Sequence, residues 1–199
     1  MILEASLLAL VVLGPPLWVG TVQHAGRWLP GDTRAYVAFS PLVFTAGAAA
    51  VLVIALDQRV PLGARPTYAL VVPLGAVMYS IDQRIVTGEA TGTSDGGRRP
   101  LVLGLVSLLG AIPEELIYRW GMYAILGSVD PLLFLGVSSV TFGLHHYQPD
   151  RPLEAGLKTA NGLVYGGLLV WSGSVLLPVL CHLAYNATFV GYRAIDTVT

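Results

Sequence analysis

Two glutamates and an arginine interrupt a long apolar run of the chain, in the stretch Pro113-Glu114-Glu115-Leu116-Ile117-Tyr118-Arg119. The apolar run extends from Leu101 to Val129, which is long enough to cross a lipid bilayer. On insertion scales, a charged side chain at the centre of a bilayer costs roughly 2.5–3.5 kcal/mol. Charged residues in such a run therefore indicate the interior of a helix bundle, and they are candidates for a functional site.

The composition of the whole chain is that of an integral membrane protein. Of its 199 residues, 54% are hydrophobic and 12% are charged, and the mean hydropathy is +0.68. A soluble domain carries about 25% charged residues. The formal net charge of −1 indicates no nucleic-acid partner. The single cysteine, Cys181, excludes an internal disulfide and favours a small buried apolar side chain over a catalytic thiol.

Seven apolar segments approach the length of about 20 residues that a membrane span needs. No segment alternates as a strand does, and helices satisfy their own backbone in lipid. We therefore predict an all-α fold, a polytopic membrane helix bundle of about seven transmembrane helices in a single membrane domain. The spans are predicted at residues 2–22, 35–56, 67–81, 101–126, 131–147, 155–171 and 175–192.

The predicted spans divide the chain into two parts. Residues 1–100 hold the first three helices and a polar loop, which we expect at residues 82–100 because this stretch is rich in Gly, Thr, Asp and Arg. Residues 101–192 form the core that carries the motifs described below. The tight turn expected at residues 172–174 joins the last two spans.

Helix geometry separates the roles of the two glutamates. Glu115 and Arg119 are four residues apart, in the favourable order, so they share a helix face and can neutralise each other. Glu114 points about 100° away and has no local partner, which makes it available as a general base. Pro113 leaves the carbonyl of Leu109 without its helical bond and favours a bend with water access beside Glu114. The alternative is that both acids and the arginine form a buried cluster of charges with a structural role only.

Two other predicted spans carry polar pairs at a spacing of four residues. Phe142 and His146 share a face at the end of the fifth span, whereas the adjacent His145 is expected to point toward a partner helix or the membrane interface. His182 and Asn186 share a face inside the seventh span, where they can donate hydrogen bonds to developing negative charge. An interfacial histidine and an interhelical hydrogen-bond clamp are the alternative interpretations.

These residues come from three spans and can converge in one bundle core. A carboxylate, two imidazoles and an amide together provide a base for water, a proton partner and an oxyanion hole, as amide hydrolysis requires. The predicted catalytic residues are Glu114, His146, His182 and Asn186.

With these motifs, the sequence resembles the CPBP family of intramembrane proteases, which includes CAAX prenyl-protein endopeptidases, bacteriocin-processing enzymes and the myxosortases. The resemblance covers about residues 110–190. It rests on three motifs in order, Glu114-Glu115-x-x-x-Arg119, Phe142-x-x-x-His146 and His182-x-x-x-Asn186.

The resemblance implies a glutamate-dependent intramembrane endopeptidase. Glu114 would activate water with the help of His146, and His182 with Asn186 would stabilise the oxyanion. The supporting residues would be Glu115, Arg119, Phe142 and Tyr118. Tyr118 departs from the family pattern, which commonly has an apolar residue there, and its hydroxyl could add a contact to the site.

The resemblance also implies a setting and partners. The protein would be a multi-pass integral protein of a prokaryotic plasma membrane, and its partners would be the lipid bilayer and a membrane-anchored peptide or protein substrate. No H-E-x-x-H motif occurs, so no metal ligand and no cofactor is assigned. A zinc site made of Glu114, His146 and His182 is the alternative by ligand type.

Two other function classes fit parts of the pattern. A non-enzymatic membrane protein of the bacteriocin-immunity type could retain the scaffold, although the intact motifs argue against it. A small proton-coupled transporter could use Glu114 and the histidines as a proton relay, but no repeated halves are visible in the sequence.

Two pairs of residues on the sixth span have softer interpretations. Gly162 and Gly166 predict close helix packing, and Asn161 with Tyr165 could line the cavity of the candidate site.

Overall fold

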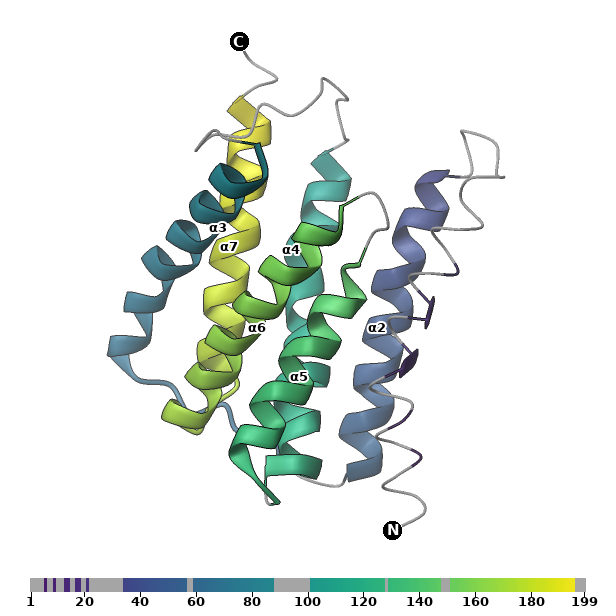
Figure 1. The fold of residues 1–199 in the computed structure, drawn as a ribbon, viewed down its shortest axis with the longest axis vertical. Coiled ribbons are helices and arrows are strands. Elements are labelled where there is room, and N and C mark those ends of the chain that lie inside the picture. The colour runs from purple at the N-terminus through teal and green to yellow at the C-terminus, as the bar shows by residue number, and fades with distance from the viewer. Residues whose placement is uncertain are drawn as a thin grey trace.

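The computed structural model describes residues 34–56, 59–87, 101–127, 129–147 and 151–195, with isolated residues between 6 and 21. Every regular element in these ranges is helical (Figure 1), which confirms the predicted all-α fold class. The α-helices are α2 (Arg34–Leu56), α3 (Val71–Thr87), α4 (Leu101–Glu115), α5 (Pro131–His145), α6 (Pro152–Ser172) and α7 (Leu176–Ile195). The 3-10 helix η1 (Pro66–Leu70) precedes α3, and the π-helical segments η2 (Leu116–Gly121) and η3 (Tyr123–Gly127) follow α4.

Most of the predicted first span lies outside the described residues. One described residue of that span, Trp18, stacks its ring on Phe44 of α2 with the centroids 5.2 Å apart. The predicted number of about seven transmembrane helices stays a prediction.

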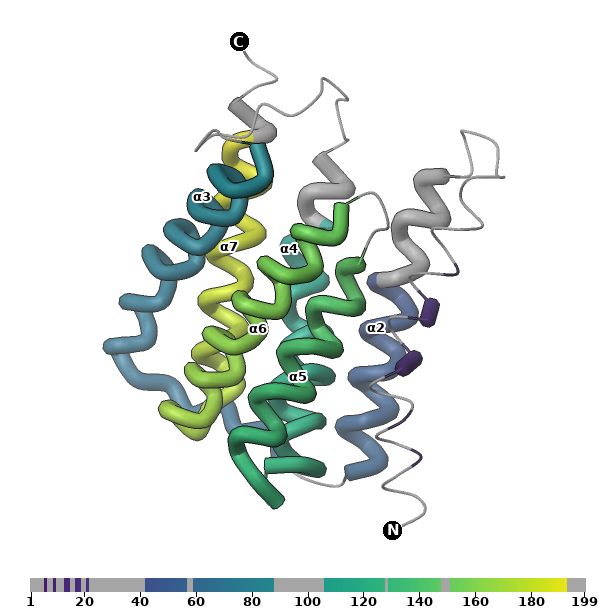
Figure 2. Tube along the Cα trace, in the orientation of Figure 1, coloured from purple at the N-terminus to yellow at the C-terminus, as the bar shows by residue number. Residues whose placement is uncertain are grey.

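The helices stand side by side in a bundle (Figures 1 and 2). The most extensive contacts join α5 with α6 and α3 with α7, and α4 packs against both α2 and α7. Helix α4, with the π-helical turns that follow it, therefore lies between the two sides of the bundle. In η2, Ile117, Tyr118 and Arg119 are completely buried.

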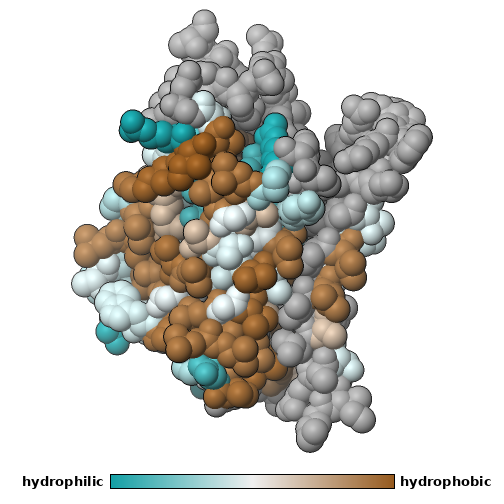
Figure 3. Space-filling model, in the orientation of Figure 1, coloured by the Kyte–Doolittle hydropathy of each residue, from teal (hydrophilic) through white to brown (hydrophobic). Residues whose placement is uncertain are grey.

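Large apolar side chains cover much of the outer surface of the bundle. Val77, Val140 and Trp171, on three different helices, are each at least half exposed. Apolar residues also predominate over the part of the described surface seen in Figure 3. By length and apolarity, the described helical segment Pro66–Thr87 is long enough to cross a membrane, and Leu42–Leu56, Pro131–His145 and Leu176–Tyr192 are shorter apolar helices.

Helix α3 is longer than the sequence predicts. The polar loop was expected to begin at Asp82, but the helix continues to Thr87. The reason is that Asp82 is buried and its carboxylate accepts hydrogen bonds from Asn161 of α6 and Tyr185 of α7. A polar residue that resembled the start of a loop is therefore part of a buried contact between helices.

The fourth predicted span is helical throughout but not uniform. Its α-helical part ends at Glu115, and the backbone then widens into the π-helical turns of η2 and η3. Pro113 lies inside the last α-helical turn. Isolated π-helical turns often occur at functional sites, and this one begins directly after the two glutamates.

Glycines allow α5 and α6 to approach closely, as predicted for Gly162 and Gly166. A Cβ atom at Gly162 would lie 2.9 Å from the Cα atom of Ser139, and one at Gly166 would lie 2.7 Å from Leu135. The predicted turn after α6 is also present. Gly173 ends this helix with φ of +65°, in the left-handed region that glycine adopts without strain.

We expect Gly162→Ala to destabilise the bundle, because the new methyl group meets the backbone of α5. Overpacking of this kind costs typically about 1–3 kcal/mol. The matched control is Gly167→Ala, in the same helix, where a Cβ atom has nothing within 4 Å. Thermal unfolding in detergent should show a lower midpoint for Gly162→Ala than for Gly167→Ala; equal midpoints would contradict the packing described here.

Candidate active site

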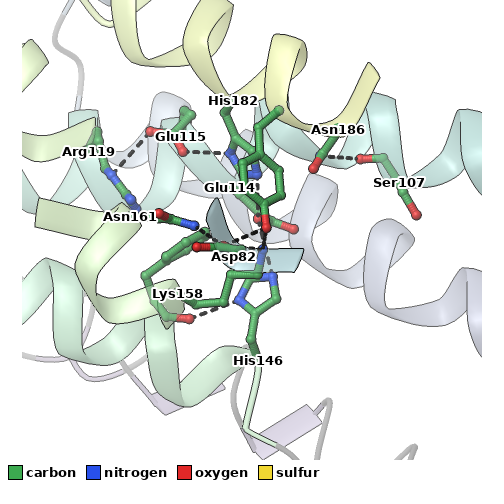
Figure 4. A network of polar contacts seen from close by, with 12 residues as sticks. Asp82, Ser107, Glu114, Glu115, Arg119, His146, Lys158, Asn161, His182 and Asn186 are labelled. Atoms are coloured by element: carbon green, nitrogen blue, oxygen red, sulfur yellow. Dashed lines mark hydrogen bonds and ion pairs between the residues drawn. The ribbon is translucent and has the colours of Figure 1, made fainter. Parts of the chain in front are cut away.

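Three helices bring one glutamate and two histidines together. Glu114 comes from the last turn of α4, His146 caps the end of α5, and His182 lies in α7. Oε2 of Glu114 is 3.9 Å from Nε2 of His146 and 3.9 Å from Nε2 of His182 (Figure 4). These residues lie far apart in the sequence, so only the fold places them around one carboxylate oxygen.

The other ring nitrogen of each histidine is held by the protein. Nδ1 of His146 is 3.0 Å from the carbonyl oxygen of Phe142, and Nδ1 of His182 is 2.8 Å from Oε1 of Glu115. A carbonyl or an ionised carboxylate only accepts hydrogen bonds, so Nδ1 carries the proton in both rings. Each ring therefore presents Nε2 to Glu114.

Glu115 joins α4 to α7 through charged contacts. Its Oε2 lies 3.2 Å from Nε of Arg119, and its Oε1 contacts His182, while the Glu115 and Arg119 side chains are both 0% exposed. The guanidinium group of Arg119 lies over the rings of Phe142 and Tyr165, at 4.4 and 5.3 Å from their centroids. The geometry of the predicted Glu115–Arg119 pair is thus present, and the contact to His182 is an addition that the sequence did not indicate.

Glu114 lacks such partners. Its Oε2 atom is buried and has no hydrogen-bond partner among the described residues. The distance of 3.9 Å to each histidine exceeds that of a direct hydrogen bond. The His146 side chain is 28% exposed and that of His182 only 5%, so the more open approach to Glu114 lies on the His146 side.

Asn186 lies one turn after His182 and faces α4. Its Nδ2 atom donates a hydrogen bond to the backbone carbonyl of Ser107, at 2.7 Å. This contact fixes the orientation of the amide and uses one of its two N–H groups.

Aromatic rings pack around the polar groups. Phe142 contacts the rings of His146 and His182, with centroids 4.7 and 5.7 Å apart, and Tyr165 stacks on His182 at 4.9 Å. Tyr118 is completely buried against Phe142 and His145, and its hydroxyl has no hydrogen-bond partner among the described residues. His145 therefore points toward a neighbouring helical segment, which is one of the two orientations expected from the sequence.

A second buried polar network, which the sequence analysis missed, joins α3, α6 and α7. Asp82 accepts hydrogen bonds from Asn161 at 2.7 Å and from the Tyr185 hydroxyl at 2.6 Å. Lys158 donates to the same hydroxyl at 2.7 Å. Lys158 and Asn161 are three residues apart in an apolar span, and this spacing is the signal that could have revealed a shared polar face.

The described residues do not form an evident metal centre. Within the part of the chain that the structure describes, no three His, Cys, Asp or Glu side chains are grouped to hold an ion. A tetrahedral zinc ion with bonds of about 2.0–2.1 Å separates its ligand atoms by about 3.4 Å. The carboxylate of Glu114 and the two imidazoles are farther apart, at 3.9 Å, so zinc would require them to move.

Comparison with known proteins gives two matches to the part of the chain that carries the site. Residues 97–188 match the family described as "Type II CAAX prenyl endopeptidase Rce1-like". The chain is 32% identical over 100 residues to a Bacillus subtilis (strain 168) protein described as "Putative membrane peptidase YdiL"; the match covers 50% of this chain and 39% of that protein. The chain thus spans about two fifths of that relative's length. No solved structure matches the chain significantly.

We expect Arg119→Gln to destabilise the protein strongly, because it leaves Glu115 buried without its cation. Breaking a buried ion pair in this way typically costs about 3–5 kcal/mol. The control is Arg151→Gln, which removes the arginine of an exposed pair with Glu154 and should cost about 1 kcal/mol or less. Chemical denaturation in detergent measures both, and similar losses would argue against a structural role for the buried pair.

Proposed function

We propose that this chain is an intramembrane endopeptidase of the kind that residues 97–188 match, the Rce1-like type II CAAX prenyl endopeptidases. It hydrolyses a peptide bond of a membrane-associated substrate with a water molecule activated by Glu114. The observation that carries this proposal is the convergence of His146 and His182 on the unpartnered oxygen of Glu114. We place the protein in a prokaryotic plasma membrane as a multi-pass protein.

Glu114 acts as the general base. A water molecule between its carboxylate and the histidines transfers a proton to Oε2, and the remaining hydroxide attacks the carbonyl carbon of the scissile peptide bond. Protonated Glu114 then returns the proton to the leaving amine as the C–N bond breaks. His146 contacts the water through Nε2, because its Nδ1–H is held by the Phe142 carbonyl.

His182 and Asn186 stabilise the oxyanion of the tetrahedral intermediate. A neutral His182 with its proton on Nδ1 offers Nε2 only as an acceptor, so donation to an oxyanion requires the imidazolium form. Oε1 of Glu115 lies 2.8 Å from Nδ1 of His182, and the Nε2 atom of the same ring faces Glu114. The second N–H of Asn186 provides the other donor, since its first is bound to Ser107.

The proposed substrate is a peptide that reaches the site from the membrane. The family description reads "CAAX prenyl endopeptidase", and a quenched farnesylated CAAX peptide is therefore the first probe to use. The aromatic and apolar side chains around His146 and His182 suit an approach from lipid more than one from bulk water.

We expect Glu114→Gln to abolish cleavage, because an amide cannot accept the proton of water. Two measurements test this: hydrolysis of the quenched peptide in detergent, and a comparison of the protein termini in cells that carry the wild type or the variant. The second detects substrates of any sequence.

The matched control is Glu154→Gln, which removes a carboxylate from the exposed start of α6. It should cleave at the wild-type rate. Cleavage by Glu114→Gln at that same rate would refute the proposed mechanism, and protection against a bacteriocin that survives this substitution would favour the immunity-type alternative.

We expect cleavage to continue when divalent metal ions are removed by chelation, because no step of the proposed mechanism uses a metal ion. The assay is hydrolysis of the quenched peptide before and after dialysis against a chelator. Loss of activity that added Zn²⁺ restores would instead support a zinc site at Glu114, His146 and His182.

A further inference from the structure

The second buried network has the Tyr185 hydroxyl at its centre. This hydroxyl donates to Oδ2 of Asp82 at 2.6 Å and accepts from Nζ of Lys158 at 2.7 Å. Asn161 donates to the same carboxylate oxygen at 2.7 Å, and Nζ of Lys158 is 3.9 Å from it. Two charged and two polar side chains from α3, α6 and α7 are thereby joined by direct contacts.

The network lies on the part of α7 that carries the proposed oxyanion donors. Tyr185 is three residues after His182 and directly before Asn186, and its ring centroid is 6.4 Å from that of His182. One face of helix α6 contacts the same part of α7. Lys158 and Asn161 on this face belong to the network, and Tyr165, one turn further along, stacks on the His182 ring.

Hydrogen bonds of this kind fix the rotation of a helix in lipid. Apolar side chains are equally well solvated by lipid and by neighbouring helices, so polar contacts and close packing determine how α7 is turned. A buried Asp82 without its partners would be strongly unfavourable. The rotation that satisfies Asp82 through Tyr185 is also the rotation that directs His182 toward Glu114.

We propose that Asp82, Lys158, Asn161 and Tyr185 are positioning residues that hold α7 in the rotation required for His182 and Asn186 to act. This inference rests on the proposed function. It also assigns a role to α3, since Asp82 lies outside residues 97–188, the segment that matches the family. The N-terminal part of the chain therefore contributes to the geometry of the site.

The first test does not depend on activity. The ¹⁵N resonances of a histidine ring report where its protons and hydrogen bonds are, and the chain has four histidines. In histidine-labelled protein in lipid nanodiscs, the signals of His182 are assigned by their absence in His182→Gln. Tyr185→Phe and Asp82→Asn should shift these signals, because α7 is no longer held.

The matched control is Tyr192→Phe. Tyr192 lies two turns further along α7, where its ring stacks on Tyr79, so this variant also removes one hydroxyl from the helix. It should leave the His182 signals unchanged. If Asp82→Asn does not fold, Tyr185→Phe decides the test alone, since it retains the ring and its packing.

The second test measures cleavage of the quenched farnesylated peptide. Misplacement of a reacting group by about 1 Å can reduce the rate by roughly 100-fold, so kcat should fall between about 10- and 100-fold with KM unchanged. Lys158→Gln should show the same pattern. An increase in KM alone would overturn the inference, since it would assign the network to substrate binding.

The two tests separate the inference from the function on which it rests. Unchanged His182 signals in both Tyr185→Phe and Asp82→Asn would overturn the positioning role, whatever the activity. Wild-type protein that does not cleave the peptide and changes no protein termini in cells would refute the proposed function, while the ¹⁵N spectra would still show whether the network holds His182.

Discussion

The buried carboxylate of Glu115 is the group on which the arrangement of the candidate site depends. One of its oxygens faces Arg119 in the next helical turn, and the other binds Nδ1 of His182 in α7. This single side chain fixes three things: the neutralisation of a buried arginine, the docking of α4 against α7, and the proton position on the His182 ring. In a membrane, where water cannot replace a lost partner, these contacts are difficult to exchange for others.

Among the described residues, two of the three acids around the site have an arginine or a lysine within 4 Å, whereas the contacts printed for Glu114 within that distance are to histidines. Within the described residues, Glu115 is paired with Arg119 and Asp82 lies near Lys158. Glu114 has the two histidines at 3.9 Å, a distance longer than that of a direct hydrogen bond. A carboxylate that the scaffold does not need for its own stability is suited to exchange protons with water and substrate.

Spacing along single helices allowed much of the site to be predicted from the sequence. The four-residue separations in the three motifs predicted which side chains share a face, and Gly162 and Gly166 predicted the close approach of α5 and α6. The contact between His182 and Glu115 joins residues far apart in the chain, and it depends on the rotation of α7, which no local pattern determines. Asp82 was assigned to a loop because one sequence does not show whether a polar residue meets water or another helix.

The length of α5 has a consequence for the surrounding lipid. This helix has 15 residues and is therefore about 22 Å long, whereas the hydrocarbon core of a bilayer is about 30 Å thick. Such a hydrophobic mismatch is relieved by local thinning of the bilayer around the short helix. His146 caps that helix, so thinning of this kind would bring the headgroup layer closer to the ring that faces Glu114. Hydration of the site would then depend on bilayer thickness, and a thicker, more ordered membrane would slow the delivery of water to the carboxylate.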